Sequence, residues 1–182
     1  TVGTTIISPA LSSITDQFGV DKTDSQSLLS VYFISLAFFQ LFYGVLSDRY
    51  GRRQPLFVGL TTLALGGLIA ALAESFEILI LARILQGFGA ASVYSIIRAI
   101  INDSYDRLES ASALALITGI MLIVPICSFA FGGLITDLVS WRGVMLGIFL
   151  AGLVPLILNI ILLPETNLHP IKKVELMNFT RD

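Results

Sequence analysis

Long apolar runs without charge, separated by short clusters of charged residues, constrain this chain more than any other feature. A helix that crosses a bilayer needs about 20 consecutive apolar residues, and most of these runs reach that length. Only 13% of the residues are charged, whereas soluble domains carry about 25%. So little polar surface cannot cover a water-soluble globule, and the chain is expected to fold in a membrane.

Six runs are long enough, or nearly long enough, to be spans. They cover residues 1–15, 25–47, 54–73, 76–101, 110–136 and 143–164, with Arg83 and Arg98 interrupting the fourth. The first run is slightly short, as expected if its start is missing, so the chain is interpreted as part of a longer protein. The sequence predicts an all-α polytopic protein with a six-helix bundle over 1–166 and a linker or tail over 167–182.

Lysine and arginine are unevenly divided between the two sides of these spans. One side holds Arg49, Arg52, Arg53, Arg107, Lys172, Lys173 and Arg181. The other side holds only Lys22 and Arg142, together with Asp16, Asp21, Asp24, Glu74, Glu77 and Asp137. Because basic loops stay on the cytoplasmic side, both ends of the chain are predicted to face the cytoplasm, with the plasma (inner) membrane as the expected location.

Composition also restricts the chemistry. The net charge is −2, which argues against nucleic acid as a partner because phosphate binding needs a basic face. The single cysteine, Cys127, and the single histidine, His169, exclude a disulfide framework and a metal site built on these residue types. The spans hold no nucleophile beside a base, so an intramembrane enzyme is disfavoured. No cofactor and no metal are expected.

The most informative segment joins the second and third runs and reads Gly-Val-Leu-Ser-Asp-Arg-Tyr-Gly-Arg-Arg over residues 44–53. Gly44 is expected to allow close packing and Gly51 to allow a tight turn between antiparallel helices. Asp48 lies near the start of the next helix, where the dipole favours a carboxylate. Arg52 and Arg53 can pair with carboxylates or lipid phosphates, and a simple positive anchor is the alternative.

This segment resembles the major facilitator superfamily, whose signature between helices two and three is G-x-L-x-D-R-x-G-R-R. The match includes every fixed position: Gly44, Leu46, Asp48, Arg49, Gly51, Arg52 and Arg53. The resemblance implies one half of a twelve-helix transporter fold. It also implies that Asp48 and Arg52 belong to a charge network that holds the cytoplasmic side closed.

The fourth run carries two further matches. Arg83-Ile84-Leu85-Gln86-Gly87 fits the family element R-x-x-Q-G, which implies a coupling role for Arg83; snorkelling to the interface is the alternative. Arg98-Ala99 followed by Asp103 resembles the R-A-x-x-x-D ending of the Bcr/CflA drug-resistance branch. Asp103 is expected at the cytoplasmic face, where it could pair with Arg52, or else be solvated. Trp141-Arg142 and Pro164-Glu165-Thr166 also resemble that branch, although an interfacial tryptophan explains Trp141 equally well.

Two runs depart from the pattern of this branch. The antiporter element P-x-x-G-P-x-x-G-G survives in the fifth run as Pro125, Gly132 and Gly133, which are still expected to bend the helix. The first run has Pro9-Ala10-Leu11, but Thr5 replaces the usual acidic residue. No Asp or Glu lies inside any run, although the branch implies H⁺ as the coupling ion. The proton carrier could lie in a missing half, another ion could couple, or the protein could be a uniporter.

Polar side chains on otherwise apolar runs are the candidates for contact with a substrate. They are Tyr32, Gln40, Gln86, Tyr94 and Asn159. The sequence thus predicts the N-terminal half of an efflux-type secondary transporter for small amphipathic or drug-like molecules. Its expected partners are the bilayer and a C-terminal six-helix half. A non-transporting six-helix module, or a truncated paralogue that associates with a partner, is the alternative.

Overall fold

The computed structural model describes residues 2–162, with only the backbone for Val2. All regular structure in this range is helical. The predicted tail over 167–182, the Pro164-Glu165-Thr166 match and the basic residues Lys172, Lys173 and Arg181 lie outside the described residues.

Five helices in the described range are long and apolar enough to cross a membrane. They are α3 (Lys22–Tyr50), α4 (Arg53–Ala71), α5 (Phe76–Ser104), α6 (Arg107–Leu138) and α7 (Trp141–Leu162). Each corresponds to one of the last five predicted runs. Most of them extend beyond the charge-free run because charged residues also occupy the first and last helical turns.

The first predicted span is not a continuous helix, so six spans are not confirmed. Its residues form α1 (Val2–Thr5), the 3-10 turn η1 (Ser8–Ala10) and α2 (Leu11–Phe18). Pro9 lies within the first two residues of η1 and cannot donate a backbone hydrogen bond, which favours a break in the helix there. None of these three elements reaches the length that a bilayer requires.

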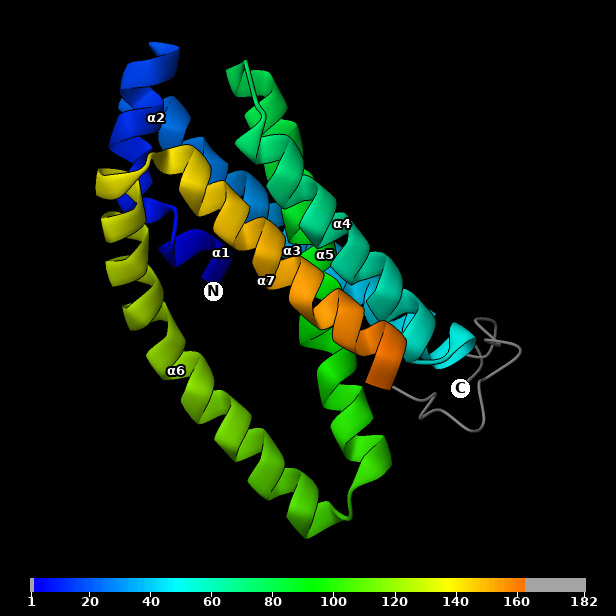
Figure 1. Cartoon of the computed structure of the whole chain (residues 1–182). Coiled ribbons are helices and arrows are strands. Elements are labelled where there is room, and N and C mark those ends of the chain that lie inside the picture. The colour runs from blue at the N-terminus through cyan, green and yellow to red at the C-terminus, as the bar shows by residue number, and fades with distance from the viewer. Residues whose placement is uncertain (1, 163–182) are drawn as a thin grey trace, which may run out of the picture.

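Helices α3, α4, α5 and α7 form a tightly packed bundle (Figure 1). Lipid tails are as apolar as the helices themselves, so close van der Waals contact holds such a bundle together. Glycines allow this contact: a Cβ added to Gly67 of α4 would lie 2.5 Å from the Phe149 nitrogen of α7. A Cβ on Gly89 of α5 would lie equally close to the Leu63 nitrogen of α4.

Helix α6 curves away from this bundle and meets it mainly near its ends (Figure 1). Its contacts include α1 and η1, where Gly132 lies against the backbone of Ile6 so closely that a side chain would not fit. Gly132 therefore provides a docking point for the broken N-terminal segment. Gly133 has looser surroundings, since its nearest neighbour for an added Cβ is Pro9 at 3.9 Å.

Trp141 is buried at the end of the bundle where α2, α5 and α7 meet, and does not sit in an exposed interfacial belt. Its indole packs against Phe18 and donates a 2.6 Å hydrogen bond to Gln17. Arg142 beside it donates to the Ala73 carbonyl at 3.1 Å. The Trp141-Arg142 pair therefore joins α7 to α2 and to the connection between α4 and α5.

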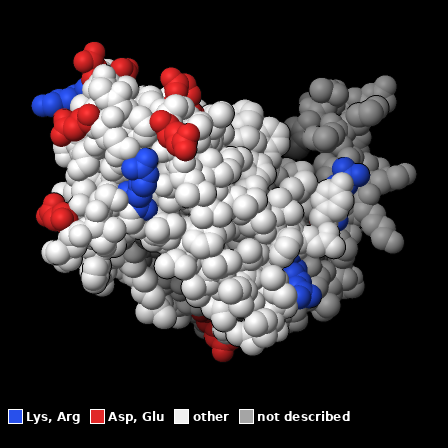
Figure 2. Space-filling view, turned by 45° about the horizontal axis from the view of Figure 1, so that its top comes forward, with Lys and Arg blue, Asp and Glu red and all other residues white. Residues whose placement is uncertain are grey.

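Charged side chains are concentrated at the ends of the molecule. Figure 2 shows most of the acidic groups gathered at one end, separated by a broad uncharged belt from basic groups at the other. The belt contains many exposed apolar residues of α3, α6 and α7. This distribution is that of a multi-pass membrane protein.

Candidate functional site

The connection between α3 and α4 is a two-residue turn at Gly51 and Arg52. Gly51 has a φ angle of 87°, a conformation that side-chain-bearing residues rarely adopt, so the expectation of a turn glycine is confirmed. Gly44 differs from its expectation. A Cβ there would meet no atom of the described residues within 4 Å, so Gly44 provides no close packing among them.

Arg52 is the centre of a charge network at this turn. Its Nη1 donates to Asp48 Oδ1 at 2.5 Å and to the Ser47 hydroxyl at 2.7 Å, and its Nε donates to Asp103 Oδ2 at 2.8 Å. Asp103 is at the end of α5, so the network joins α5 to the turn between α3 and α4. The expected pairing of Arg52 with Asp103 is formed, and Ser47 is a partner that the motif did not reveal.

The burial of Arg52 alone would lower the pKa of its guanidinium. Hydrogen bonds and charge attraction from Asp103 and then Asp48 outweigh this effect, so the pKa of Arg52 is raised above its ordinary value. The Arg52 side chain is only 10% exposed, whereas Asp103 is 29% and Asp48 51% exposed. The network thus consists of one buried cation between two carboxylates that water reaches to different degrees.

The other two arginines of the motif lie outside this pairing. The guanidinium of Arg49 lies 5.3 Å from the centre of the Tyr50 ring. Arg53 instead donates a 2.8 Å hydrogen bond to the Ile160 carbonyl in the last turn of α7. Arg53 therefore fastens the start of α4 to the end of α7.

A second buried arginine, Arg83 of α5, has no exposed surface. Its Nε donates to the Leu28 carbonyl of α3 at 3.2 Å, and its Nη1 donates to Gln86 Oε1 at 2.6 Å. Gln86 in turn donates to the Gly66 carbonyl of α4 at 3.1 Å. The guanidinium also lies 4.6 Å from the centre of the Tyr32 ring, a cation–π contact.

This arrangement places Arg83 inside the bundle and not at an interface, so it does not snorkel. Arg83 and Gln86 together connect α3, α4 and α5. One guanidinium nitrogen, Nη2, has no hydrogen-bond partner among the described residues. Arg98, in contrast, is exposed and does not contact Arg83.

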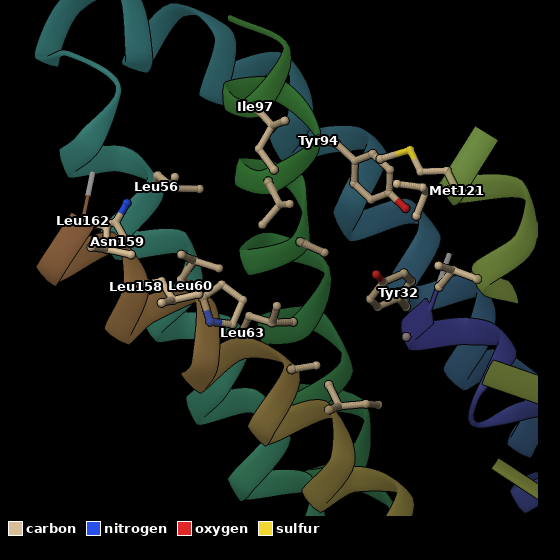
Figure 3. A pocket seen from close by; sticks show the side chains of 18 residues that line it. Tyr32, Leu56, Leu60, Leu63, Tyr94, Ile97, Met121, Leu158, Asn159 and Leu162 are labelled. Atoms are coloured by element: carbon tan, nitrogen blue, oxygen red, sulfur yellow. The ribbon is translucent and has the colours of Figure 1, made fainter. Parts of the chain in front are cut away.

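A cavity of about 600 Å³ lies between α3, α4, α5, α6 and α7. Among the described residues its lining is almost entirely apolar, with Tyr32, Tyr94 and Asn159 as the polar side chains, while Arg98 does not line it. In Figure 3, Tyr94 points from α5 toward Met121 of α6, near Tyr32, whereas Asn159 lies at the opposite end, among apolar side chains. The cavity therefore has a tyrosine end, an apolar middle and an amide end.

Three of the five predicted substrate-facing residues line this cavity, and two do not. Gln86 is buried behind Tyr32 with Arg83, and Gln40 lies further along α3. Apolar residues of α6 and α7, including Met121, Ala151 and Pro155, form much of the wall. Sequence reasoning missed them because an apolar side chain that faces a cavity has the same hydropathy as one that faces lipid.

Pro125 lies inside α6, which remains one helix from Arg107 to Leu138. The residue lacks a backbone N–H, so the carbonyl of Met121, one turn earlier, loses its helical donor. Met121 and Val124 line the cavity on this stretch of α6. Pro125 therefore directly follows the stretch of α6 that lines the cavity. Figure 1 shows that the helix as a whole is curved.

Comparison with known families gives one profile match, described as Major Facilitator Superfamily, over residues 1–178. An "Uncharacterized transporter" of Rickettsia bellii is 37% identical over 164 residues, which are 90% of this chain and 40% of that protein. "Multidrug resistance protein D" of Escherichia coli is 32% identical over 138 residues, which are 76% of this chain and 35% of that protein. The chain thus spans about two fifths of the length of these relatives.

The fold resembles a solved structure as well. The crystal structure of the human organic anion transporter MFSD10 (TETRAN) superposes with a TM-score of 0.67 at 21% sequence identity. The similarity covers 91% of this chain and 44% of that one. At this level of identity it supports the arrangement of helices alone.

Proposed function

The chain belongs to the Major Facilitator Superfamily, and from that membership we propose that it forms the N-terminal half of a secondary active transporter. The proposed transporter moves small amphipathic or drug-like molecules outward across the plasma membrane by alternating access. In such proteins two six-helix halves rock about a central site, so the first run, residues 1–15, would belong to the sixth span and a second half would complete the fold.

The observation that supports this proposal best is the charge network around Arg52. Arg52 joins the α3–α4 turn to the end of α5 through its 2.8 Å pair with Asp103, and it also pairs with Asp48 of α3 at 2.5 Å. Ion pairs at a hydrated helix end can separate at modest cost because water replaces the partner. We propose that this network is the cytoplasmic latch, which holds the outward-open state and opens when the protein turns inward.

Proton coupling is part of the same proposal. All acidic residues within the five long helices lie in first or last turns: Asp24, Asp48, Glu77, Asp103, Glu109 and Asp137. The proposed proton carrier is therefore a carboxylate of the second half. Arg83 is proposed to influence coupling through Tyr32, which it contacts on one side and which faces the cavity on the other.

The test is transport by the purified full-length transporter, with both halves present, in proteoliposomes, with a panel of drug-like compounds and an imposed pH gradient. We expect accumulation of at least one compound against its gradient, and loss of that accumulation when an uncoupler collapses the pH difference. Transport that an uncoupler leaves unchanged would overturn proton coupling. Absence of transport for every compound, from protein that unfolds cooperatively, would favour a non-transporting membrane module.

The proposed orientation can be tested separately. Single cysteines at Ser104 and at Ser75, in a variant with Cys127 replaced by serine, lie at opposite ends of α5. A membrane-impermeant thiol reagent added to intact cells should label the cysteine at position 75 and not the one at position 104. The reverse labelling pattern would place both ends of the chain outside the cytoplasm.

A further inference from the structure

The amide end of the cavity contains a polar side chain whose hydrogen-bonding capacity is unused. Asn159 is 5% exposed, and neither its amide nitrogen nor its amide oxygen has a hydrogen-bond partner among the described residues. Leaving such a group unpaired in an apolar environment is costly, because water is lost and nothing replaces it. The flanking side chains, Leu56 and Leu162, cannot supply a partner (Figure 3).

The same face of α7 contains a backbone carbonyl that lacks its usual helical donor. Ala151, Pro155 and Asn159 follow each other at intervals of four residues, and all three line the cavity. Pro155 has no N–H, so the Ala151 carbonyl lacks its usual helical donor. This face of α7 therefore offers an acceptor at Ala151 and both a donor and an acceptor at Asn159.

Charge restricts the kind of molecule that would fit. None of the described residues that line the cavity is charged, so no carboxylate among them could hold a cation. Two arginines lie near its ends: Arg83 behind Tyr32 at one end, and Arg53 bonded to Ile160, the neighbour of Asn159, at the other. A cationic ligand would be desolvated between two positive charges, which is unfavourable at both ends.

We infer that this cavity binds neutral, lipophilic molecules that carry a carboxamide, and that Asn159 is the polar anchor for that group. A carboxamide places a carbonyl acceptor beside an N–H donor, so it can form a two-point hydrogen-bonded pair with the asparagine amide. The apolar body fills the middle of the cavity, whose volume is in the range of small-molecule sites. Leu162, which is largely exposed, lines the cavity beside Asn159 at this end.

The inference assigns a substrate class to the proposed transporter. It rests on the proposed transport function only for the steps that follow binding, so binding can be tested by itself. Three naphthalene probes of similar shape test it: 2-naphthamide, 2-acetylnaphthalene and 2-(aminomethyl)naphthalene. The first is a neutral donor and acceptor, the second a neutral acceptor only, and the third a cation. Their affinities are measured by equilibrium dialysis against the intact protein in lipid nanodiscs, with empty nanodiscs to subtract partitioning into lipid.

We expect the amide to bind about tenfold more tightly than the ketone, as one additional buried hydrogen bond would give. The cation should bind most weakly of the three. Asn159→Leu should remove the preference for the amide, because the amide then loses two hydrogen bonds to this residue and the ketone only one. The matched control is Asn102→Leu, which changes an exposed asparagine of α5 outside the cavity and should leave all three affinities unchanged.

Folding is monitored in parallel, because it provides an independent readout. Asn159→Leu replaces an unpaired buried amide by an apolar group, so the unfolding midpoint should rise while amide binding falls. If that variant does not fold, Ala151→Phe fills the cavity from the same helix face and should abolish binding of both neutral probes. An amide preference that survives Asn159→Leu, or a cation that binds best, overturns the inference.

The two proposals can fail separately. Amide binding that depends on Asn159, in a protein that transports neither the probes nor any compound of the drug-like panel, would support the binding site and refute the transport function. Transport of drug-like molecules by a protein that shows no amide preference in dialysis would support the transport function and refute the role of Asn159.

Discussion

Two arginines are buried in the described part of the chain, and they are neutralised by different means. Arg52, in the turn between α3 and α4, is held by the carboxylates of Asp48 and Asp103. Arg83, in the middle of the bundle, contacts a backbone carbonyl, the Gln86 amide and the Tyr32 ring, and no carboxylate of the described residues.

The difference arises from where water can replace a lost partner. At a hydrated helix end, two charges that separate are each stabilised by solvent, so an ion pair there can open and close. Inside the bundle a carboxylate left without its partner would be strongly destabilised. Leaving a carbonyl or amide oxygen without its partner costs less free energy. The Arg52 network is therefore suited to a contact that changes during a cycle, and the Arg83 network to one that persists.

The largest effect is expected from Arg83→Ala, because it leaves the Leu28 carbonyl and the Gln86 oxygen without a donor. We expect transport to fall at least about a hundredfold, and the free energy of unfolding to fall by about 2 kcal/mol, measured as a midpoint shift of about 4–8 °C. Arg83→Lys should recover part of the stability, since an ammonium keeps the charge but lacks the planar guanidinium that donates to two acceptors at once.

The control for Arg83 is Arg98→Ala, which removes an exposed arginine from the same helix. Its unfolding midpoint should stay within about 1 °C of the parent protein, as for most surface substitutions. If Arg83→Ala and Arg98→Ala changed the unfolding midpoint equally, the hydrogen bonds of Arg83 inside the bundle would contribute no stability of their own.

A smaller effect is expected from Arg52→Gln. The substitution removes the cation from between two carboxylates, but water can partly solvate both of them, so about 1 kcal/mol of stability should be lost. Transport should fall about tenfold because the cytoplasmic latch no longer closes. Arg49→Gln, in the same motif but without a carboxylate contact in the described structure, should reduce transport less than twofold; equal losses would refute the latch.

Sequence alone predicted the features that depend on composition or on a matched motif. Charge-free runs located the five long helices, because the cost of placing a charge in lipid confines most charges to helix ends. The motif and the position of Asp103 together predicted its pairing with Arg52, across 51 residues of sequence. Gly51 was recognisable because a tight turn between two helices needs an unusual backbone angle.

Other features depend on packing that hydropathy does not record. The break in the first run arises where Pro9 interrupts the helix and Ile6 packs against Gly132. Averaged hydropathy records neither the position of a proline nor a contact between helices. The burial of Asn159 and its lack of a partner could not be read from a single polar residue in an apolar run. Ser47 was missed because a serine in a helix is usually bonded to its own backbone.

Within the Arg52 network the two carboxylates should differ, and Asp103→Asn should have the larger effect. Asp103 is the less exposed of the two and connects α5 to the turn, so its ion pair is less screened. A double-mutant cycle between Arg52→Gln and Asp103→Asn should give a coupling free energy of about 0.5–1 kcal/mol. A coupling near zero would mean that the 2.8 Å contact adds no stability.

The smallest effect is expected from Asp48→Asn, because Asp48 is half exposed and lies one helical turn from Arg52. We expect transport to fall about two- to threefold, with a coupling to Arg52 of about 0.3 kcal/mol and an unchanged amount of protein in the membrane.

The dependence on salt concentration also distinguishes the two carboxylates. At about 1 M NaCl the screening length is near 3 Å, so the effect of Asp48→Asn should disappear while part of the Asp103→Asn effect remains. If salt abolished both effects equally, the two ion pairs would be equally hydrated, and Asp103 could not be the contact that holds α5 against the turn.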